Sequence, residues 1–162
     1  MSSPSSSPAF TLEQEISKTH QLLQMMQQEQ GLLVKADIKG LDELVKSKSV
    51  VVEQLLELAK LRNKNLEAAG FKGKEGSMQA WLDNLSASKN DRETYQKQWT
   101  ELVTLTKSAK ETNRINGLLI GSHMKRNQLA FNALNNATKG ESLYGPDGQR
   151  GMDITARYLA TS

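Results

Sequence analysis

Few side chains in this chain of 162 residues could perform catalysis or hold a metal. The sequence has no cysteine, which excludes thiol nucleophiles, disulfides and cysteine metal sites. Its two histidines, His20 and His123, lie far apart, and a zinc or iron site built on several histidines needs more of them. Neither has a serine and an aspartate placed for a catalytic relay, and the carboxylates alternate with basic residues as on solvated helices. We therefore expect no enzyme, no cofactor and no metal.

One glycine-rich stretch has a spacing that could bind phosphate. Gly70, Gly73 and Gly76 recur at every third residue. A phosphate-binding loop would follow a predicted strand and end in Gly-Lys followed by Ser or Thr, and the sequence offers neither feature. This stretch therefore predicts a loop between helices.

The chain is weakly basic, and the basic excess lies in one stretch. The net charge is +3, and residues 89–139 hold nine basic and four acidic residues. This excess is too small to predict nucleic-acid binding, which needs a dense basic patch. No apolar run is long enough to span a bilayer, and residues 1–8 lack the basic and apolar regions of a secretory signal. We expect a cytoplasmic protein with no stable membrane insertion.

The apolar spacing predicts four helices, and no proline interrupts residues 9–145. The first helix runs from about residue 12 to the mid-30s, with Thr11 and Gln14 in a capping-box pattern. The second follows a break near residues 37–40 and ends before Gly70, which suits a helix C-cap. A short helix capped by Ser77 follows, and a long helix then runs from about Asp91 to residues 135–137. The short helix would bury Met78, Trp81, Leu82 and Leu85.

These helices predict an all-α fold. We expect an elongated antiparallel helical bundle with three main helices packed like a coiled coil, a short connecting helix, and one long C-terminal helix. Residues 1–10 are rich in serine and proline and predict a disordered tail. The bundle would then occupy residues 11–138, and residues 139–162 would form a flexible C-terminal tail.

The long helix carries apolar residues on two faces. One face holds Leu102, Leu105, Ala109, Asn113, Asn116, Ile120, Met124, Asn127, Phe131 and Leu134. The opposite side holds Ile115, Leu118, Leu129 and Ala133. A helix that is covered on one side needs only one such stripe. The second stripe is either covered by the rest of the chain or open to an amphipathic helix of a partner.

Small and polar residues interrupt this helix. Asn113, Asn116 and Asn127 either fix the register of the bundle or form hydrogen bonds with an incoming helix, and the sequence leaves both open. Gly117 and Gly121 each cost about 1 kcal/mol relative to alanine. That cost indicates close approach of another segment or a local bend.

Several motifs together resemble the FlgN family. They are Asn113-x-x-Asn116-Gly117-Leu118-Leu119, then Arg126-Asn127-Gln128, and then Leu143-Tyr144-Gly145-Pro146-Asp147-Gly148-Gln149. The N-terminal half is similar in pattern, with Glu29 on the first helix and Lys46, Lys48 and Arg62 on the second. The Ser/Pro-rich start, the glycine-rich loop with Trp81 and the segment after Gln149 depart from the family pattern.

The resemblance implies a cytoplasmic chaperone of flagellar type III export. Such a chaperone binds the C-terminal amphipathic helical segments of the hook–filament junction proteins FlgK and FlgL, prevents their early assembly and brings them to the membrane export gate. The substrate-binding residues would be Asn113, Ile115, Asn116, Leu118, Leu119, Arg126, Asn127, Leu129 and Ala133. Leu143, Tyr144 and Gly145 would contact the gate protein FlhA, and FliJ is a second export partner that the resemblance suggests.

Two other hypotheses compete with the chaperone. The residues alone also fit a coiled-coil structural or adaptor protein that self-associates through the second stripe and has no secretion substrate. A basic helical nucleic-acid binder fits less well, because the positive charge is sparse.

Overall fold

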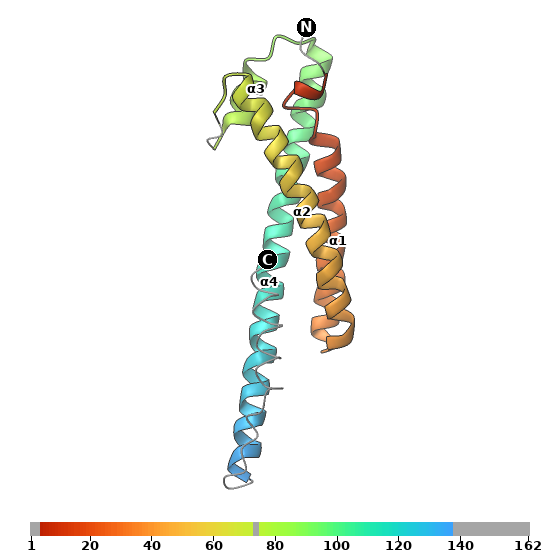
Figure 1. The fold of residues 1–162 in the computed structure, drawn as a ribbon, viewed down its shortest axis with the longest axis vertical. Helices are drawn as coiled ribbons and strands as arrows, with labels where there is room; N and C mark the ends of the chain where they lie inside the picture. The colour runs from red at the N-terminus through yellow and green to blue at the C-terminus, as the bar shows by residue number, and fades with distance from the viewer. Residues whose placement is uncertain (1–3, 73–74, 138–162) are drawn as a thin grey trace. The chain divides into compact units, whose positions relative to one another are not determined.

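The structure is a computed structural model that describes residues 4–72 and 75–137. Its helices are α1 (Leu12–Val34), α2 (Ile38–Ala68), α3 (Ser77–Asp83) and α4 (Lys89–Ala137), after a 3-10 turn, η1 (Pro4–Ser6). The two long helices α1 and α2 pack against α4, and α3 lies between α2 and α4 in the chain (Figure 1). The described residues contain no strand, which confirms the predicted all-α class. None of the described helices is long and apolar enough to cross a membrane.

The segment before α1 packs against α2, whereas its composition predicted a disordered tail over residues 1–10. The Asn65 side-chain amide on α2 donates to the backbone carbonyls of Ser5 and Ser7 at 3.1 and 3.0 Å. Ala9 is buried in the core beside Leu12. The polar segment is held because a buried amide satisfies its backbone and Ala9 has apolar cover.

The short connection between α1 and α2 contains a C-terminal cap for α1 and an N-terminal cap for α2. Ala36 ends α1 in the left-handed conformation, with φ of 56°. Its amide donates to the Leu33 carbonyl at 3.2 Å, and the Asp37 amide donates to the Leu32 carbonyl at 3.0 Å. These two bonds form a Schellman motif. The Asp37 carboxylate then caps α2 by accepting a hydrogen bond from the Gly40 amide at 3.2 Å.

The end of α2 and the start of α3 depend on glycine. Gly70 has φ of 90°, and the Phe71 amide donates to the Leu66 carbonyl at 2.8 Å, which confirms Gly70 as the C-cap glycine. The prediction that Ser77 caps α3 is wrong, because the N-cap is Gly76 and Ser77 is the first helical residue. The N-cap has φ of 86°, a conformation that glycine adopts far more readily than serine.

The helices contribute to two compact units. Unit 1 comprises residues 1–24 and 50–110, as far as they are described. Its core consists of Ala9, Leu12, Leu66, Met78, Trp81, Leu82 and Leu102, with five half-buried apolar side chains packed against it. Unit 2 comprises residues 25–49 and 111–162, again as far as they are described. Its core cluster has two buried members, Leu33 and Ile120, surrounded by the half-buried Leu41, Val45, Leu119 and Met124.

Replacing Ala36 with glycine should stabilise the protein. The left-handed conformation costs a residue with a Cβ about 1–2 kcal/mol, and the greater freedom of glycine in the unfolded chain offsets part of that gain. We expect Ala36→Gly to raise the free energy of unfolding by about 0.5–1 kcal/mol in urea denaturation. As a control, Ala130→Gly, at an exposed helical position of α4, should lower it by about 1 kcal/mol. An Ala36→Gly variant that loses stability would contradict the strain argument.

Candidate protein-binding site

A buried polar cluster joins the three helices inside unit 2. Glu29 of α1, Lys48 of α2 and Asn116 of α4 are 0%, 0% and 1% exposed. The Lys48 ammonium lies 3.1 Å from Oε2 of Glu29. The Asn116 side-chain amide donates to Oε1 of Glu29 at 2.7 Å and to the Met26 carbonyl at 2.9 Å. Each of the three helices therefore contributes one buried polar side chain to this cluster.

Burial makes this ion pair costly. Desolvation raises the pKa of Glu29 above its ordinary value of 4.5, although Lys48 and the Asn116 amide act in the opposite direction. A buried pair of this kind contributes little net stability, but the loss of one partner is expensive because it leaves the other charge uncompensated. The cluster thus penalises any arrangement of the three helices in which Glu29 and Lys48 do not meet.

Unit 1 contains a related arrangement. Arg62 of α2 donates from Nε to both carboxylate oxygens of Glu15 on α1, at 3.2 and 3.0 Å, and the Thr11 hydroxyl donates to the same carboxylate at 2.9 Å. The Arg62 guanidinium lies 5.1 Å from the centre of the Trp99 ring of α4, a cation–π distance. In each unit, therefore, an acid of α1 pairs with a base of α2, and α4 supplies the third contact.

Sequence reasoning missed these two pairs as interactions. It noted Glu29, Lys48 and Arg62 only as part of the family pattern. The available signal was that two acidic residues of the first helix and two basic residues of the second helix have the same spacing. Glu15 and Glu29 are 14 residues apart (29 minus 15), and so are Lys48 and Arg62 (62 minus 48).

Several predicted binding residues of α4 lie inside unit 2 or at its edge. Asn116 belongs to the buried cluster, which supports its register-fixing role. Leu119 is half-buried against the Leu33–Ile120 cluster. Asn113 and Ile115 are also half-buried. His123 is half-buried too, and its Nε2 donates to the Leu33 carbonyl, as expected for a structural histidine.

The other predicted residues are exposed on α4. Leu118 and Leu129 are 62% and 59% exposed, and Ala133, Arg126 and Asn127 are also exposed. We call Leu118, Leu129 and Ala133 the outer stripe. Leu118 and Leu129 are 11 residues apart (129 minus 118), about three helical turns, so both point to the same side of α4. Of the two alternatives for the second stripe, the described residues favour an open one.

The first stripe also becomes exposed toward the end of α4. Every residue from 125 to 134 is exposed, including Phe131 at 42% and Leu134 at 54%. In unit 2, Met124 is the last residue of α4 that packs against the Leu33–Ile120 cluster. Gly121 does not reflect a close approach, because a Cβ there would meet no described atom within 4 Å. The predicted gate-docking residues Leu143, Tyr144 and Gly145 lie outside the described residues.

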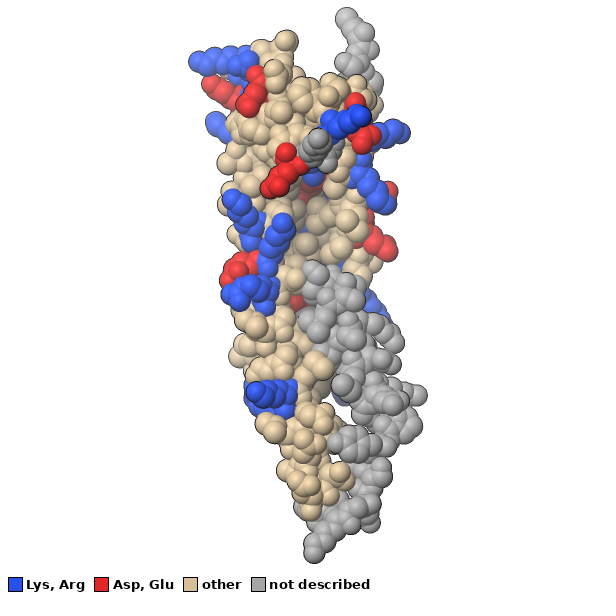
Figure 2. Space-filling model, turned by 90° about the vertical axis from the view of Figure 1, so that its left-hand side faces the viewer, with Lys and Arg blue, Asp and Glu red and all other residues tan. Residues whose placement is uncertain are grey.

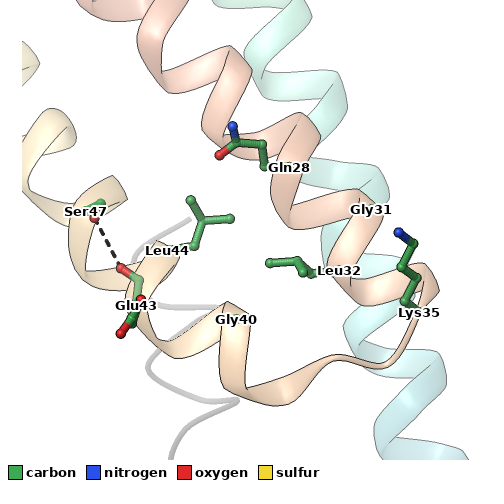
Figure 3. A pocket seen from close by; sticks show the side chains of 8 residues that line it. All are labelled: Gln28, Gly31, Leu32, Lys35, Gly40, Glu43, Leu44 and Ser47. Carbon is green, nitrogen blue, oxygen red and sulfur yellow. Dashed lines mark hydrogen bonds between the residues drawn. The ribbon is translucent and has the colours of Figure 1, made fainter.

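A groove lies between α1 and α2 of unit 2, where the two helices approach each other closely at Gly40. It has a volume of about 510 Å³, and Figure 3 shows Leu32 of α1 and Leu44 of α2 within it, with the Ser47 hydroxyl bonded to the Glu43 carbonyl. A Cβ at Gly40 would lie 3.1 Å from both methyl carbons of Leu32, so glycine permits the close approach of the helices there. No group of three or more potential metal ligands occurs among the residues that the structure describes.

Comparison with known proteins identifies the family. A family model described as FlgN protein matches residues 7–151. The chain belongs to the FlgN family. Over 154 residues, which cover 91% of this chain and 92% of the relative, it is 29% identical to the flagella synthesis protein FlgN of Yersinia enterocolitica. It is also 28% identical over 148 residues to the protein of the same name from Proteus mirabilis. This alignment covers 90% of this chain and 91% of the relative. No solved structure matches the chain.

Family membership has two consequences for the earlier predictions. It confirms the resemblance drawn from the Asn113–Leu119 and Leu143–Gln149 motifs. FlgN-family chaperones are not enzymes, which also confirms the prediction drawn from the lack of a nucleophile with its base.

Removing one member of the buried pair should be far more damaging than removing both. We expect Glu29→Met alone to lower the free energy of unfolding by about 3–5 kcal/mol, because Lys48 would stay buried without its carboxylate. The double variant Glu29→Met with Lys48→Met should be as stable as the parent protein or up to about 4 kcal/mol more stable. Urea denaturation measures both. A control on the exposed Glu57–Lys60 pair, which is 75% and 73% exposed, should change stability little in either form.

The stability difference between the double variant and the parent protein should also depend on pH. The pKa of Glu29 in the folded protein lies above 4.5, its ordinary value in the unfolded chain. At pH values between the unfolded and the folded pKa, the folded protein therefore binds more protons than the unfolded chain. The contribution of Glu29 to unfolding free energy therefore falls as pH rises through that window. The double variant lacks this group, so its advantage over the parent should grow across the window and stay constant above it. Denaturation at a series of pH values from 4.5 to 8 tests this, and an advantage that shrinks with pH would contradict it.

Proposed function

We propose that this FlgN-family protein binds the C-terminal amphipathic helical segments of FlgK and FlgL on the outer stripe of α4. FlgN proteins are known as the export chaperones of FlgK and FlgL. The observation that carries the proposal is the exposure of Leu118 and Leu129, two large apolar side chains on one side of a single helix. Leucines at such spacing are the kind of anchors onto which an amphipathic helix packs.

The remaining predicted substrate-binding residues would take different parts in this surface. Arg126, Asn127 and Ala133 are exposed and would contact the bound segment directly. Asn113 and Ile115 are half-buried and would form its edge. Asn116 and Leu119 would act from inside, by holding α4 in register with α1 and α2.

The chaperone would work by covering an apolar seam. A subunit segment that later packs inside an assembled structure exposes its apolar side before assembly. Binding that side to α4 shields it from water and from other subunits until it is released. We place this activity in the cytoplasm, with transient contact at the membrane export gate.

Charge on the outer stripe should abolish this binding. We expect Leu118→Glu with Leu129→Glu to remove complex formation with C-terminal fragments of FlgK and FlgL, because a buried carboxylate would face the apolar side of the segment. Size-exclusion chromatography with light scattering measures the complexes, and circular dichroism checks that helicity is unchanged. Leu56→Glu, at a residue that is 55% exposed on α2, is the matched control, and a C-terminal fragment of flagellin is the control ligand.

Two results would count against this site. Binding that survives in the Leu118→Glu, Leu129→Glu variant would exclude the outer stripe. A stable dimer of the parent protein that binds neither FlgK nor FlgL would favour the self-associating adaptor instead.

For delivery, we propose that Leu143, Tyr144 and Gly145 contact the cytoplasmic domain of FlhA, with FliJ as a second export partner. Tyr144 is an aromatic residue among turn-forming Gly145, Pro146 and Gly148, a setting that suits a docking anchor. We expect Tyr144→Ala to weaken binding to FlhA in a pull-down while FlgK and FlgL still bind. Equal loss of both kinds of partner would contradict a separate gate-docking role.

A further inference from the structure

The charge along the C-terminal half of α4 has one sign. From Thr112 to Ala137 the helix holds Arg114, Lys125 and Arg126 and no acidic residue. Arg114 is already engaged, since it donates to the Glu111 carboxylate at 3.0 and 2.8 Å. Figure 2 shows the corresponding lower part of α4 as largely uncharged surface with basic side chains and no acidic side chain in view.

Lys125 and Arg126 border the outer stripe. Lys125 comes four residues before Leu129, and Arg126 comes three before it, so both are neighbours of Leu129 on the helix surface. At about 100° per residue, they lie on opposite sides of the line from Leu118 to Leu129. Both are exposed, and neither forms an ion pair with any described residue. The apolar stripe is thus flanked on each side by a cation.

This arrangement favours one kind of ligand. We propose that the outer stripe selects an amphipathic helix whose apolar side is bordered by acidic residues, with Lys125 and Arg126 as the specificity-determining contacts. The proposal deepens the proposed function and depends on it. Charges at the border of an apolar contact mainly accelerate encounter and exclude partners of like charge, while the apolar centre holds the complex together.

An anionic membrane surface would match the same pattern, since basic residues beside an apolar stripe also suit lipid headgroups. Two cations are few for that role, because each contributes only modestly to binding at a lipid surface. We therefore argue for an acidic helix of a protein.

Charge reversal tests the proposal. We expect Lys125→Glu with Arg126→Glu to slow association with the FlgK and FlgL C-terminal fragments about ten-fold at 50 mM NaCl and to change dissociation little. The difference from the parent protein should largely vanish at 500 mM NaCl, because salt screens exposed charges. Surface plasmon resonance gives both rate constants. Reversing the acidic residues that border the apolar side of the fragment to lysine should restore fast association with the variant.

A matched control separates local from global charge. Lys64→Glu with Lys97→Glu changes the net charge equally, at exposed residues of α2 and of the N-terminal part of α4. We expect this control to stay within two-fold of the parent protein. Equal slowing in both double variants, or none in either, would overturn the proposal. So would a Lys125→Glu, Arg126→Glu variant that keeps its affinity for the fragments but loses binding to vesicles containing phosphatidylglycerol.

The Leu118→Glu, Leu129→Glu variant distinguishes failure of the proposed binding surface from failure of the preference for acidic borders. If Leu118→Glu with Leu129→Glu abolishes binding while charge reversal has no effect, the substrate surface stands and the preference for acidic borders fails. If neither pair of substitutions affects binding, the outer stripe itself is not the site, and the proposed function fails at that surface.

Discussion

The ion pairs between α1 and α2, one buried and one partly buried, constrain the rest of this structure. A carboxylate and a cation that are both removed from water must meet each other, because an uncompensated charge in the interior is far more costly than a misplaced apolar side chain. Glu29 meets Lys48 in unit 2, and Glu15 meets Arg62 in unit 1. Because the spacing is 14 residues on both helices, a single antiparallel alignment of the two sequences satisfies both pairs. Apolar stripes alone would tolerate a shift by a turn more easily.

The role of α4 follows from this constraint. It adds Asn116 to one pair and the ring of Trp99 to the other, so its contact with the hairpin is specified by polar chemistry as well as by apolar packing. This matters most in unit 2, where the apolar cluster is small. Past Met124 the cluster ends, and the apolar side chains of α4 are left on the surface. In unit 2, the exposure of Leu129, Phe131 and Leu134 follows from the end of this cluster at Met124.

Much of the fold could be predicted from the sequence, because its signals are local. The absence of proline, the apolar stripes and the glycine at position 70 define the helices nearly as they occur. The cap of α3 was misassigned, because Ser77 has the right chemistry but the backbone conformation at the preceding residue requires glycine. The packing of residues 4–9 was also missed, because it depends on Asn65, which is distant in sequence.

The candidate site was less predictable. Periodicity identified two faces on α4 but could not say where the cover of each face ends, since that depends on the length of the hairpin and its register. For the same reason Asn116 could be read as either a binding residue or a structural one, and only its bond to Glu29 separates the two.

Gly121 has a consequence for how tightly a ligand can be held. Glycine loosens a helix by about 1 kcal/mol relative to alanine, and no described neighbour of Gly121 makes use of the missing side chain. This position of low helix propensity lies just before the exposed end of α4. A ligand that packs there must order the backbone as it binds, which weakens the complex without removing any contact. For an export chaperone, which releases its cargo, a lower helix propensity beside the proposed binding surface would favour release.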